Sequence, residues 1–295
     1  MSLNATATDD LPRISFEFFP PKNPDAEEQL FKAVKVLAAY RPDFVSVTYG
    51  AGASSRTPTF ATVRRMLAET DLVVASHLTV VKSTRAEVDE VIGQFREMGV
   101  SRFVALRGDP PGGIGTAYTP FPGGYANAAA LVQGLRGIDD FDISVSAYPE
   151  KHPESADRAA DIAMLKLKAD NGANRALTQF FFDNDVFEDY LNAVRAAGVS
   201  IPVVPGIMPI QNIKQLKNFA ALCGASIPAA VEARFAGLDD DPAGRFEVAA
   251  DIAAEQVMDL RRRGLTDFHF YTMNRSKLMS AVLERIGFSA LSSVS

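Results

Sequence analysis

Short apolar runs alternate with longer amphipathic stretches along most of the chain. The runs are four to seven residues long and rich in Val, Ile, Phe or Thr, which is typical of strands buried on both faces of a parallel sheet. The predicted strands are Arg13–Phe18, Asp43–Thr48, Leu72–Leu78, Arg102–Leu106, Asp142–Ala147, Asn174–Thr178, Ile201–Val204 and Asp267–Tyr271.

Between these runs, apolar residues recur at the three- and four-residue spacing of an amphipathic helix. Leu30, Val34 and Leu37 form one such stripe, and Gly99 and Gly198 follow two of the stretches, as glycine commonly does after a helix. The predicted helices are Glu27–Tyr40, Thr84–Met98, Ser155–Ala169, Asn184–Ala197 and Arg245–Arg262.

The strand starts are about 30 residues apart, the length of one β-turn-α unit, with one longer interval before the last strand. Eight units predict an α/β fold, a single (β/α)8 TIM barrel over residues 12–288, with a flexible N-terminal tail over 1–11 and a C-terminal tail over 289–295. The alternative, an open doubly wound sheet, normally splits at a linker. No linker rich in Pro, Gly or Ser lies at any midpoint, and Gly108–Gly124 follows a strand, so we interpret it as a functional loop.

Composition narrows the class of protein. The 295 residues are 47% hydrophobic with a net charge of −6, which excludes wholesale disorder and makes the chain a poor binder of duplex DNA. No apolar run approaches the ~20 residues that cross a bilayer, and the polar start from Met1 to Asp10 does not resemble a secretory signal. Cys223 is the only cysteine, so no internal disulfide can form. We therefore expect a cytoplasmic protein with no nucleic-acid or membrane partner.

Side chains that can donate, accept or titrate lie at or just past the end of nearly every predicted strand. Active sites of barrels lie at the C-terminal ends of the strands, so this concentration favours an enzyme. The residues are Glu17, Thr48, Tyr49, His77, Arg107, Asp109, Tyr148, Glu150, His152, Gln179, Tyr271, Asn274 and Arg275.

Several of these residues also have a purely structural interpretation. Glu17 is flanked by phenylalanines, where burial would raise its pKa and suit a general acid; the alternative is a solvent-facing glutamate at the rim. Asp109 is either functional or a turn residue paired with Arg107. For His77 taken by itself, we favour the interpretation as a buried core histidine. His269 alternates with phenylalanines and is interpreted as structural.

Other barrel and nucleotide-binding chemistries fit less well. Gly50–Gly52 follows a strand, but Ser55 stands where a dinucleotide-binding fingerprint has its third glycine. Only His77 and His152 are available at the strand ends as histidine ligands, so we predict no metal site. No lysine ends a predicted strand, which argues against a Schiff-base aldolase.

Together, the strand-end motifs resemble the bacterial 5,10-methylenetetrahydrofolate reductase family, whose members are flavoproteins of one-carbon metabolism. The motifs occur in family order and are very specific as a set, and the resemblance covers nearly the whole chain, from about Ile14 to Gly287. They are Phe16–Pro21, Val47–Ala51, His77–Thr79, Leu106–Asp109, Ala147–Glu150 with His152–Pro153, Gly172–Arg175 leading into Thr178–Asp183, Pro205–Pro209, and Phe268–Thr272 with Asn274–Arg275.

The resemblance implies a barrel that holds FAD at the C-terminal face of its strands, either tightly or in reversible exchange. It implies reduction of 5,10-methylenetetrahydrofolate to 5-methyltetrahydrofolate with NADH or NADPH, by a ping-pong mechanism in which hydride passes through FAD. The product of the family feeds methionine synthesis. The chain resembles the short bacterial form without a regulatory module, and such relatives are often homo-oligomers.

The resemblance also assigns roles to residues. Glu17 matches the general acid that protonates the amine nitrogen expelled when the imidazolidine ring of the folate opens. Asp109 matches a carboxylate between flavin and pterin, where its charge stabilises a cationic iminium, and Gln179 matches an amide that contacts both folate and nicotinamide. Further substrate-side positions are matched by Gln215, Phe219 and Arg275.

A larger set of residues falls where relatives contact FAD. Arg107 and Lys168 match partners of the pyrophosphate or its surroundings. Met164 and Leu167 stand where relatives often carry polar or basic residues, so the match on this helix rests on Asp161 and Lys168 and leaves the affinity for FAD open. The FAD-contact residues are Thr48, Tyr49, Ala51, His77, Arg107, Gly108, Asp109, Tyr125, Tyr148, His152, Asp161 and Lys168.

Two other classes of function stay open beside the reductase. One is a folate-binding methyltransferase barrel that uses no flavin, and the other is a non-catalytic barrel that keeps only the fold. The presence of both Glu17 and Asp109 opposes the non-catalytic class. The visible spectrum of the purified protein distinguishes the reductase from the methyltransferase.

Overall fold

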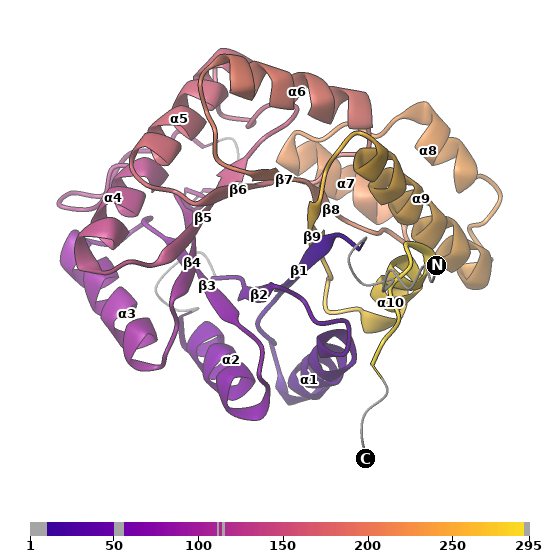
Figure 1. Cartoon of the computed structure of the whole chain (residues 1–295), viewed down its shortest axis with the longest axis horizontal. Coiled ribbons are helices and arrows are strands. Elements are labelled where there is room, and N and C mark those ends of the chain that lie inside the picture. The colour runs from indigo at the N-terminus through magenta and orange to yellow at the C-terminus, as the bar shows by residue number, and fades with distance from the viewer. Residues whose placement is uncertain (1–10, 50–55, 111, 114–115, 292–295) are drawn as a thin grey trace, which may run out of the picture.

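Parallel strands form the inner layer of the molecule, and helices surround them (Figure 1). The structure is a computed structural model that describes residues 11–49, 56–110, 112–113 and 116–291. The strands are β1 (Arg13–Phe18), β2 (Phe44–Val47), β3 (Val74–Thr79), β4 (Arg102–Leu106), β5 (Asp142–Ala147), β6 (Arg175–Thr178), β7 (Val203–Val204), β8 (Gly206–Ile207) and β9 (Asp267–Tyr271).

Helices follow the strands and cover the outside of the sheet. Several of them begin at a polar cap. Asn23 accepts a hydrogen bond from the Ala26 N–H at the start of the first helix, and Thr84 forms a capping box with Glu87 at the third. The helices are α1 (Pro24–Ala38), α2 (Arg56–Glu69), α3 (Arg85–Glu97), α4 (Ala128–Ile138), α5 (Arg158–Asp170), α6 (Asn184–Ala196), α7 (Ile213–Cys223), α8 (Ala229–Arg234), α9 (Pro242–Arg262) and α10 (Ser276–Arg285).

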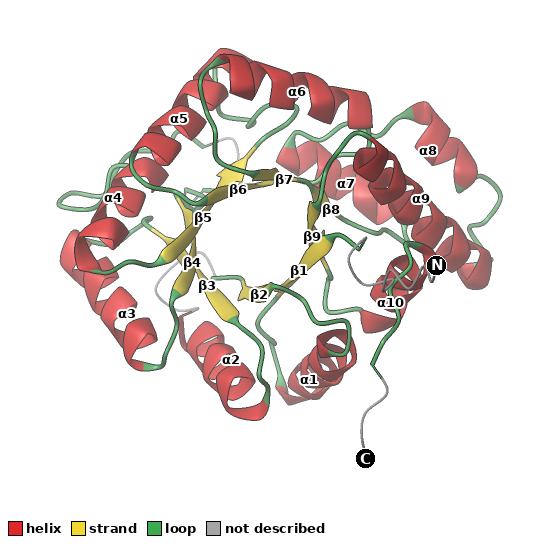
Figure 2. Ribbon diagram, viewed as in Figure 1, coloured by secondary structure: helices red, strands yellow, loops and turns green. Residues whose placement is uncertain are grey.

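The sheet curls into a nearly closed barrel because its two edge strands are neighbours in the sequence. Adjacent strands pair in parallel in the order β7-β6-β5-β4-β3-β2-β1-β9-β8. Pro205 separates β7, which pairs with β6, from β8, which pairs with β9, and its carbonyl accepts a hydrogen bond from the His269 N–H at 3.0 Å. The two short strands thus together occupy one strand position of the barrel. The predicted TIM barrel is confirmed (Figure 2).

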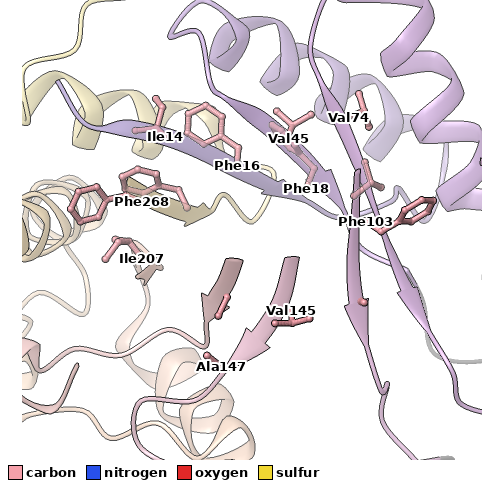
Figure 3. Packing of buried hydrophobic residues seen from close by; sticks show 14 of the residues in the cluster. Ile14, Phe16, Phe18, Val45, Val74, Phe103, Val145, Ala147, Ile207 and Phe268 are labelled. Atoms are coloured by element: carbon pink, nitrogen blue, oxygen red, sulfur yellow. The ribbon is translucent and has the colours of Figure 1, made fainter. Parts of the chain in front are cut away.

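The main core lies between the strands and the helices. Phe16, Phe18 and Phe268 are fully buried there (Figure 3). Helix residues such as Leu30 belong to the same cluster. Successive side chains of a strand point to opposite faces of the sheet. Glu17, which lies between Phe16 and Phe18, therefore points into the barrel instead of toward the helices.

The observed elements agree with the pattern of the sequence. Each predicted strand matches an observed one within two residues at either end, although the seventh is split around Pro205. The predicted helices correspond to α1, α3, α5, α6 and α9, and the long interval before the last strand also holds α7 and α8. Of the predicted N-terminal tail, only Leu11 is among the described residues. The C-terminal tail is described as far as Leu291, whose N–H donates to the Ala39 carbonyl at 3.1 Å.

Candidate active site

A groove with three connected parts crosses the C-terminal ends of the strands. We call them the α5 part, the central part and the α7 part. The α5 part is lined by Tyr49, Thr79, Leu106, Arg107, Gly108, Asp109, Asn127, Ala128, Ser146, Ala147, Tyr148, His152, Ser155, Ala160, Asp161, Met164, Leu165, Lys168 and Tyr190. The central part is lined by Glu17, Phe19, Thr48, Tyr49, His77, Val104, Leu106, Ser146, Tyr148, Leu177, Gln179, Phe180, Met208, Phe219, Tyr271 and Met273. The α7 part is lined by Met208, Pro209, Ile210, Gln211, Asn212, Gln215, Leu216, Phe219, Thr272, Met273, Arg275, Leu278 and Met279.

The three parts of the groove share lining residues and therefore adjoin one another. Tyr148 and Ser146 belong to both the α5 part and the central part. Phe219, Met208 and Met273 belong to both the central part and the α7 part. The structure thereby brings most of the predicted site residues onto one continuous surface.

Glu17 lines the central part and lies between two histidines. Its Oε2 is 3.3 Å from His77 Nε2 and 3.7 Å from His269 Nε2. Glu17 is 7% exposed, His77 is 6% exposed and His269 is fully buried. The strand order brings them together, because β1 pairs with β9 on one side and with β2, the neighbour of β3, on the other.

The pKa of Glu17 differs from the expectation based on its phenylalanine neighbours. Burial does raise this pKa, but the charge that His77 can carry and the contacts with His77 and His269 outweigh burial and lower the pKa to about 2. The predicted rise was therefore wrong, because the side chain faces two imidazoles and the phenylalanines face the other side of the sheet. The lowered pKa favours the carboxylate form of Glu17.

Both imidazoles are held in place by serines. Ser15 Oγ lies 2.8 Å from His269 Nδ1, and Ser46 Oγ lies 3.3 Å from His77 Nε2. The ring of Phe44 stacks on His269 with centroids 5.9 Å apart. His269, which the sequence pattern marked as structural, therefore belongs to the cluster behind Glu17.

Lys168 places a buried ammonium group in the α5 part. Its side chain is 6% exposed, and Nζ donates to the Ser146 carbonyl at 2.9 Å and to the Ser146 hydroxyl at 3.2 Å. Burial lowers the pKa of Lys168 to about 8, against the opposing effect of Asp161. Asp161 itself accepts hydrogen bonds from the His152 N–H and the Ser155 hydroxyl, so it also shapes the loop after β5.

Arg107 lines the α5 part with its charge already paired. Nη1 and Nη2 donate to the two carboxylate oxygens of Glu154 at 2.6 and 2.9 Å, and Nε donates to the Gly108 carbonyl at 3.1 Å. The guanidinium also lies 4.6 Å from the centroid of the Tyr118 ring. The hydrogen bonds from Arg107 lower the pKa of Glu154. An anion in this part would meet the remaining N–H groups of an oriented guanidinium.

His152 and Tyr148 provide two neutral rings beside Arg107. The Glu154 N–H donates to His152 Nδ1 at 3.1 Å, so this nitrogen carries no proton. Burial and the nearby Arg107 lower the pKa of His152, and burial raises the pKa of Tyr148. The two rings meet edge to face with centroids 4.7 Å apart.

Gly108 allows the sharp turn that presents Asp109 to the groove. Its φ is +84°, and a Cβ atom there would lie 2.8 Å from a Val81 methyl group and 2.9 Å from Thr79 Cβ. Only glycine satisfies both constraints without strain. Asp109 follows directly and lines the α5 part with an exposed carboxylate.

Gln179 follows β6 and lines the central part. Its Oε1 accepts a hydrogen bond from the Phe180 N–H at 3.0 Å, so its NH2 group is what remains for a ligand. The neighbouring Tyr271 hydroxyl donates to the Thr178 carbonyl at 2.6 Å, and burial raises the pKa of Tyr271 well above its ordinary value.

The α7 part combines an aromatic face with polar ends. Phe219 is 40% exposed and stacks on Phe180 with centroids 5.5 Å apart and planes 12° from parallel. Gln215 lies one turn earlier on α7, and Arg275 precedes α10. Such a surface suits a ligand with an aromatic ring and an anionic end.

Not every predicted contact residue lines the groove. The Tyr125 hydroxyl donates to Asp89 at 2.7 Å, and Arg85 covers its ring, so this side chain is used inside the helical layer. Ala51 lies outside the described residues. Of the two departures from the family pattern, Met164 lines the α5 part, whereas Leu167 is 45% exposed and does not.

Some site residues had no assigned role in the sequence. Ser15, Ser46 and Ser146 contact His269, His77 and the Lys168 ammonium, respectively. Their signal was a small polar residue alternating with apolar ones inside a predicted strand, which marks the inner face of a barrel. Tyr190 lines the α5 part from α6 and had no such signal.

Among residues 11–49, 56–110, 112–113 and 116–291, no group of three or more His, Cys, Asp or Glu side chains is arranged to hold a metal ion. Within the same described part of the chain, none of the helices has the length and apolar character needed to cross a membrane.

Solved structures of low sequence identity share the fold. A protein from Clostridium thermocellum, described as binding two copies of 5-methyl-5,6,7,8-tetrahydrofolic acid, matches with a TM-score of 0.62 and 15% identity over 94% of each chain. Dihydropteroate synthase from Xanthomonas albilineans, in complex with 7,8-dihydropteroate, matches with a TM-score of 0.51 and 15% identity, covering 93% of this chain and 92% of the synthase chain.

Sequence comparisons are more specific. Residues 2–287 match the family model of methylenetetrahydrofolate reductase. The chain is 43% identical over 276 residues to 5,10-methylenetetrahydrofolate reductase of Pectobacterium carotovorum subsp. carotovorum, and 42% identical over 274 residues to that of Escherichia coli K12. Each alignment covers 93% of this chain and 90% of the relative. Methylenetetrahydrofolate reductase (NADH) 1 of Arabidopsis thaliana is 36% identical over 292 residues, which are 95% of this chain and 49% of the plant protein. The chain therefore belongs to the methylenetetrahydrofolate reductase family of oxidoreductases.

Proposed function

We propose that this chain reduces 5,10-methylenetetrahydrofolate to 5-methyltetrahydrofolate, with FAD bound in the groove and NADH or NADPH as the hydride donor. The observation that carries the proposal is the buried cluster of Glu17, His77 and His269 beneath a groove, in a chain of this family. A barrel of similar fold binds 5-methyltetrahydrofolic acid, which supports a folate ligand.

The α5 part fits a flavin dinucleotide. Arg107 and Lys168 supply cationic donors for a diphosphate, and the neutral rings of Tyr148 and His152 supply flat surfaces close to them. Met164 adds an apolar contact on the same side. When bound here, FAD would accept hydride from the nicotinamide cofactor and pass it to the methylene carbon of the folate.

In this proposal Glu17 delivers a proton to the substrate. Opening of the imidazolidine ring leaves an amine nitrogen that needs one. Glu17 and His77 line the groove, whereas His269 lies behind them and contacts Ser15. Because the lowered pKa favours the carboxylate form, Glu17 must take up a proton before it can give one to the substrate. The imidazoles of His77 and His269, 3.3 and 3.7 Å from Glu17 Oε2, are the titratable side chains next to it.

Asp109 and Gln179 orient and stabilise the reacting groups. The exposed carboxylate of Asp109 favours a cationic iminium through its charge. The NH2 group of Gln179 donates to an oxygen of the pterin in one half-reaction and of the nicotinamide carboxamide in the other. In the α7 part, Phe219 would stack on the benzoyl ring of the folate and Arg275 would pair with its glutamate.

The proposed function includes its cellular setting. The chain would act in one-carbon metabolism, where its 5-methyl product serves methionine synthesis. We propose a cytoplasmic homo-oligomer whose partners are small molecules. A sizing column with in-line light scattering measures the oligomeric state directly.

The proposed function is tested by the flavin content and the kinetics of the purified protein. We expect a yellow protein, or a colourless one that regains nicotinamide oxidation when FAD is added. Double-reciprocal plots at several folate concentrations should be parallel, because the two substrates occupy one site in turn. Full activity without detectable flavin would refute the FAD role. A flavin-free protein that binds methyltetrahydrofolate but does not oxidise NADH or NADPH would favour the methyltransferase class.

A further inference from the structure

Glu150 follows β5 in the sequence and does not line any of the three parts of the groove. Its carboxylate instead contacts the segment just after α7. Oε1 and Oε2 each lie 2.9 Å from the backbone nitrogen of Ser226, whose N–H donates to both oxygens. The bond joins the loop after β5 to the end of a helix that lies far from it in the sequence.

The turn after α7 packs closely against the same loop. Gly224 has a φ of +72°, and a Cβ atom there would lie 3.0 Å from the Lys151 carbonyl oxygen and 3.3 Å from Pro153 Cγ. The following Ala225 N–H donates to the Ala220 carbonyl at 3.0 Å, which closes the helix end. Two backbone segments are therefore in direct contact, and the Glu150–Ser226 hydrogen bond holds them together.

This contact links the two ends of the groove. The loop after β5 carries Tyr148 and His152, which line the α5 part, whereas α7 carries Gln215 and Phe219, which line the α7 part. In Figure 1, α5 and α7 lie on different sides of the barrel. The loop after β5 is thus the common neighbour of the proposed flavin and folate ends of the site.

We propose that Glu150 is a positioning residue that fixes the C-terminal end of α7 to the loop after β5, and so places Phe219 and Gln215 for folate binding. The proposal rests on the proposed function, which assigns the α7 part to folate. Glu150 touches neither substrate nor cofactor in this account. Without the Glu150 carboxylate, the C-terminal end of α7 is free to move. Folate binding must then offset the loss of conformational entropy when this end becomes ordered, so the affinity for folate falls.

The two sides of the hydrogen bond can be removed independently. Glu150→Ala removes the acceptor. Ser226→Pro removes the donor and keeps the acceptor, with Ser226→Ala as the matched control because it retains the N–H. Glu150→Gln keeps one neutral acceptor oxygen and should restore part of the wild-type behaviour. The double variant Glu150→Ala with Ser226→Pro should be no worse than the more affected single variant, since one bond is lost in each case.

Two measurements follow these variants in the full-length protein. Hydrogen–deuterium exchange over Ile213–Cys223 should rise in Glu150→Ala and Ser226→Pro and stay at the wild-type level in Ser226→Ala, while exchange over α5 is unchanged. In the loaded enzyme, KM for methylenetetrahydrofolate should rise about fivefold to tenfold, as expected for the loss of one ordinary hydrogen bond at an exposed position. Reduction of the bound flavin by the nicotinamide cofactor and the dissociation constant of FAD should stay within about twofold of wild type.

Several outcomes would overturn the proposal. Unchanged exchange of α7 in Glu150→Ala would show that the hydrogen bond does not position the helix. Equal losses in the folate and nicotinamide half-reactions would show a general structural role. If neither the wild type nor any variant reduced methylenetetrahydrofolate, the proposed function would fail. If exchange of α7 still responded as described, the positioning of α7 by Glu150 would stand.

Discussion

Glu17 and His77 meet inside the barrel because the residue between them is small. Glu17 on β1 is paired in register with Ser46 on β2, and the His77 imidazole on β3 lies 3.3 Å from both the Ser46 hydroxyl and Glu17 Oε2. Two strands that are not adjacent thereby share a polar contact across the one between them. A larger side chain at Ser46 would occupy the space in which the carboxylate and the imidazole meet.

Glu17→Gln separates the two half-reactions of the proposed mechanism. The amide keeps the shape but cannot carry the proton, so folate-dependent reoxidation of the flavin should fall about 10²-fold or more. Reduction by the nicotinamide cofactor needs no proton from this residue and should change little. Stopped-flow absorbance of the flavin measures both steps.

The matched control is Asp109→Asn, which removes a charge in the same groove without touching the proton cluster. It should have a milder effect on folate reduction and should raise the reduction potential of the flavin. A Glu17→Gln protein that reduces methylenetetrahydrofolate at the wild-type rate would exclude Glu17 as the proton donor.

The free energy of unfolding should fall in acid partly because Glu17 becomes protonated. The folded-state pKa is about 2, below the ordinary value of 4.5, so the folded protein binds fewer protons than the unfolded chain between these values. The contribution is therefore present above pH 4.5 and is lost as the pH falls toward 2. Urea unfolding at pH 5 and pH 3 should show a smaller loss of unfolding free energy in Glu17→Gln than in wild type. An identical pH dependence in both proteins would contradict the pairing of Glu17 with the histidines.

FAD binding should weaken at alkaline pH through Lys168. The pKa of this buried lysine is lowered to about 8, and only its protonated form attracts a diphosphate. The dissociation constant of FAD, measured by quenching of flavin fluorescence, should rise as the pH passes from 7 to 9. Lys168→Gln should bind FAD more weakly at pH 7 and should lose this step. A step of the same size in Lys168→Gln would assign the titration to another group.

Gln179→Glu should weaken the binding of both substrates. The Gln179 Oε1 is engaged by the Phe180 N–H, so the substitution removes the donors that face a ligand and adds a negative charge. Each lost hydrogen bond to a neutral group costs on the order of 1 kcal/mol of binding free energy, and a buried partner left unpaired costs about 1–3 kcal/mol. Because the pterin of the folate presents more polar edge, folate binding should weaken more than binding of the nicotinamide cofactor.

Gln215→Glu provides the comparison for Gln179→Glu, because Gln215 lines only the α7 part and should affect folate alone. Initial-rate kinetics with each substrate varied separates the two patterns. If Gln179→Glu changed the KM of one substrate only, and the double-reciprocal plots intersected, two separate binding pockets would replace the single alternating site.

The sequence by itself determined the strands, the barrel and the edge of the sheet where the site lies. These features depend on local patterns: continuous apolar runs, helical spacing and polar residues at strand ends, all of which act within one β-turn-α unit. Glu17, Asp109 and Gln179 were identified in this way, and the structure places each of them in the groove.

Only the tertiary structure decided what each side chain touches. The pKa of Glu17 falls because the strand order brings His77 and His269 to its carboxylate, a contact that the flanking phenylalanines do not reveal. The resemblance assigns Tyr125 to FAD contact, yet its hydroxyl donates to Asp89 in the helical layer. The bond between Glu150 and Ser226 joins two loops whose proximity depends on the closure of the whole barrel. Such contacts are set by register and by the path of distant segments, and local sequence patterns contain no information on either.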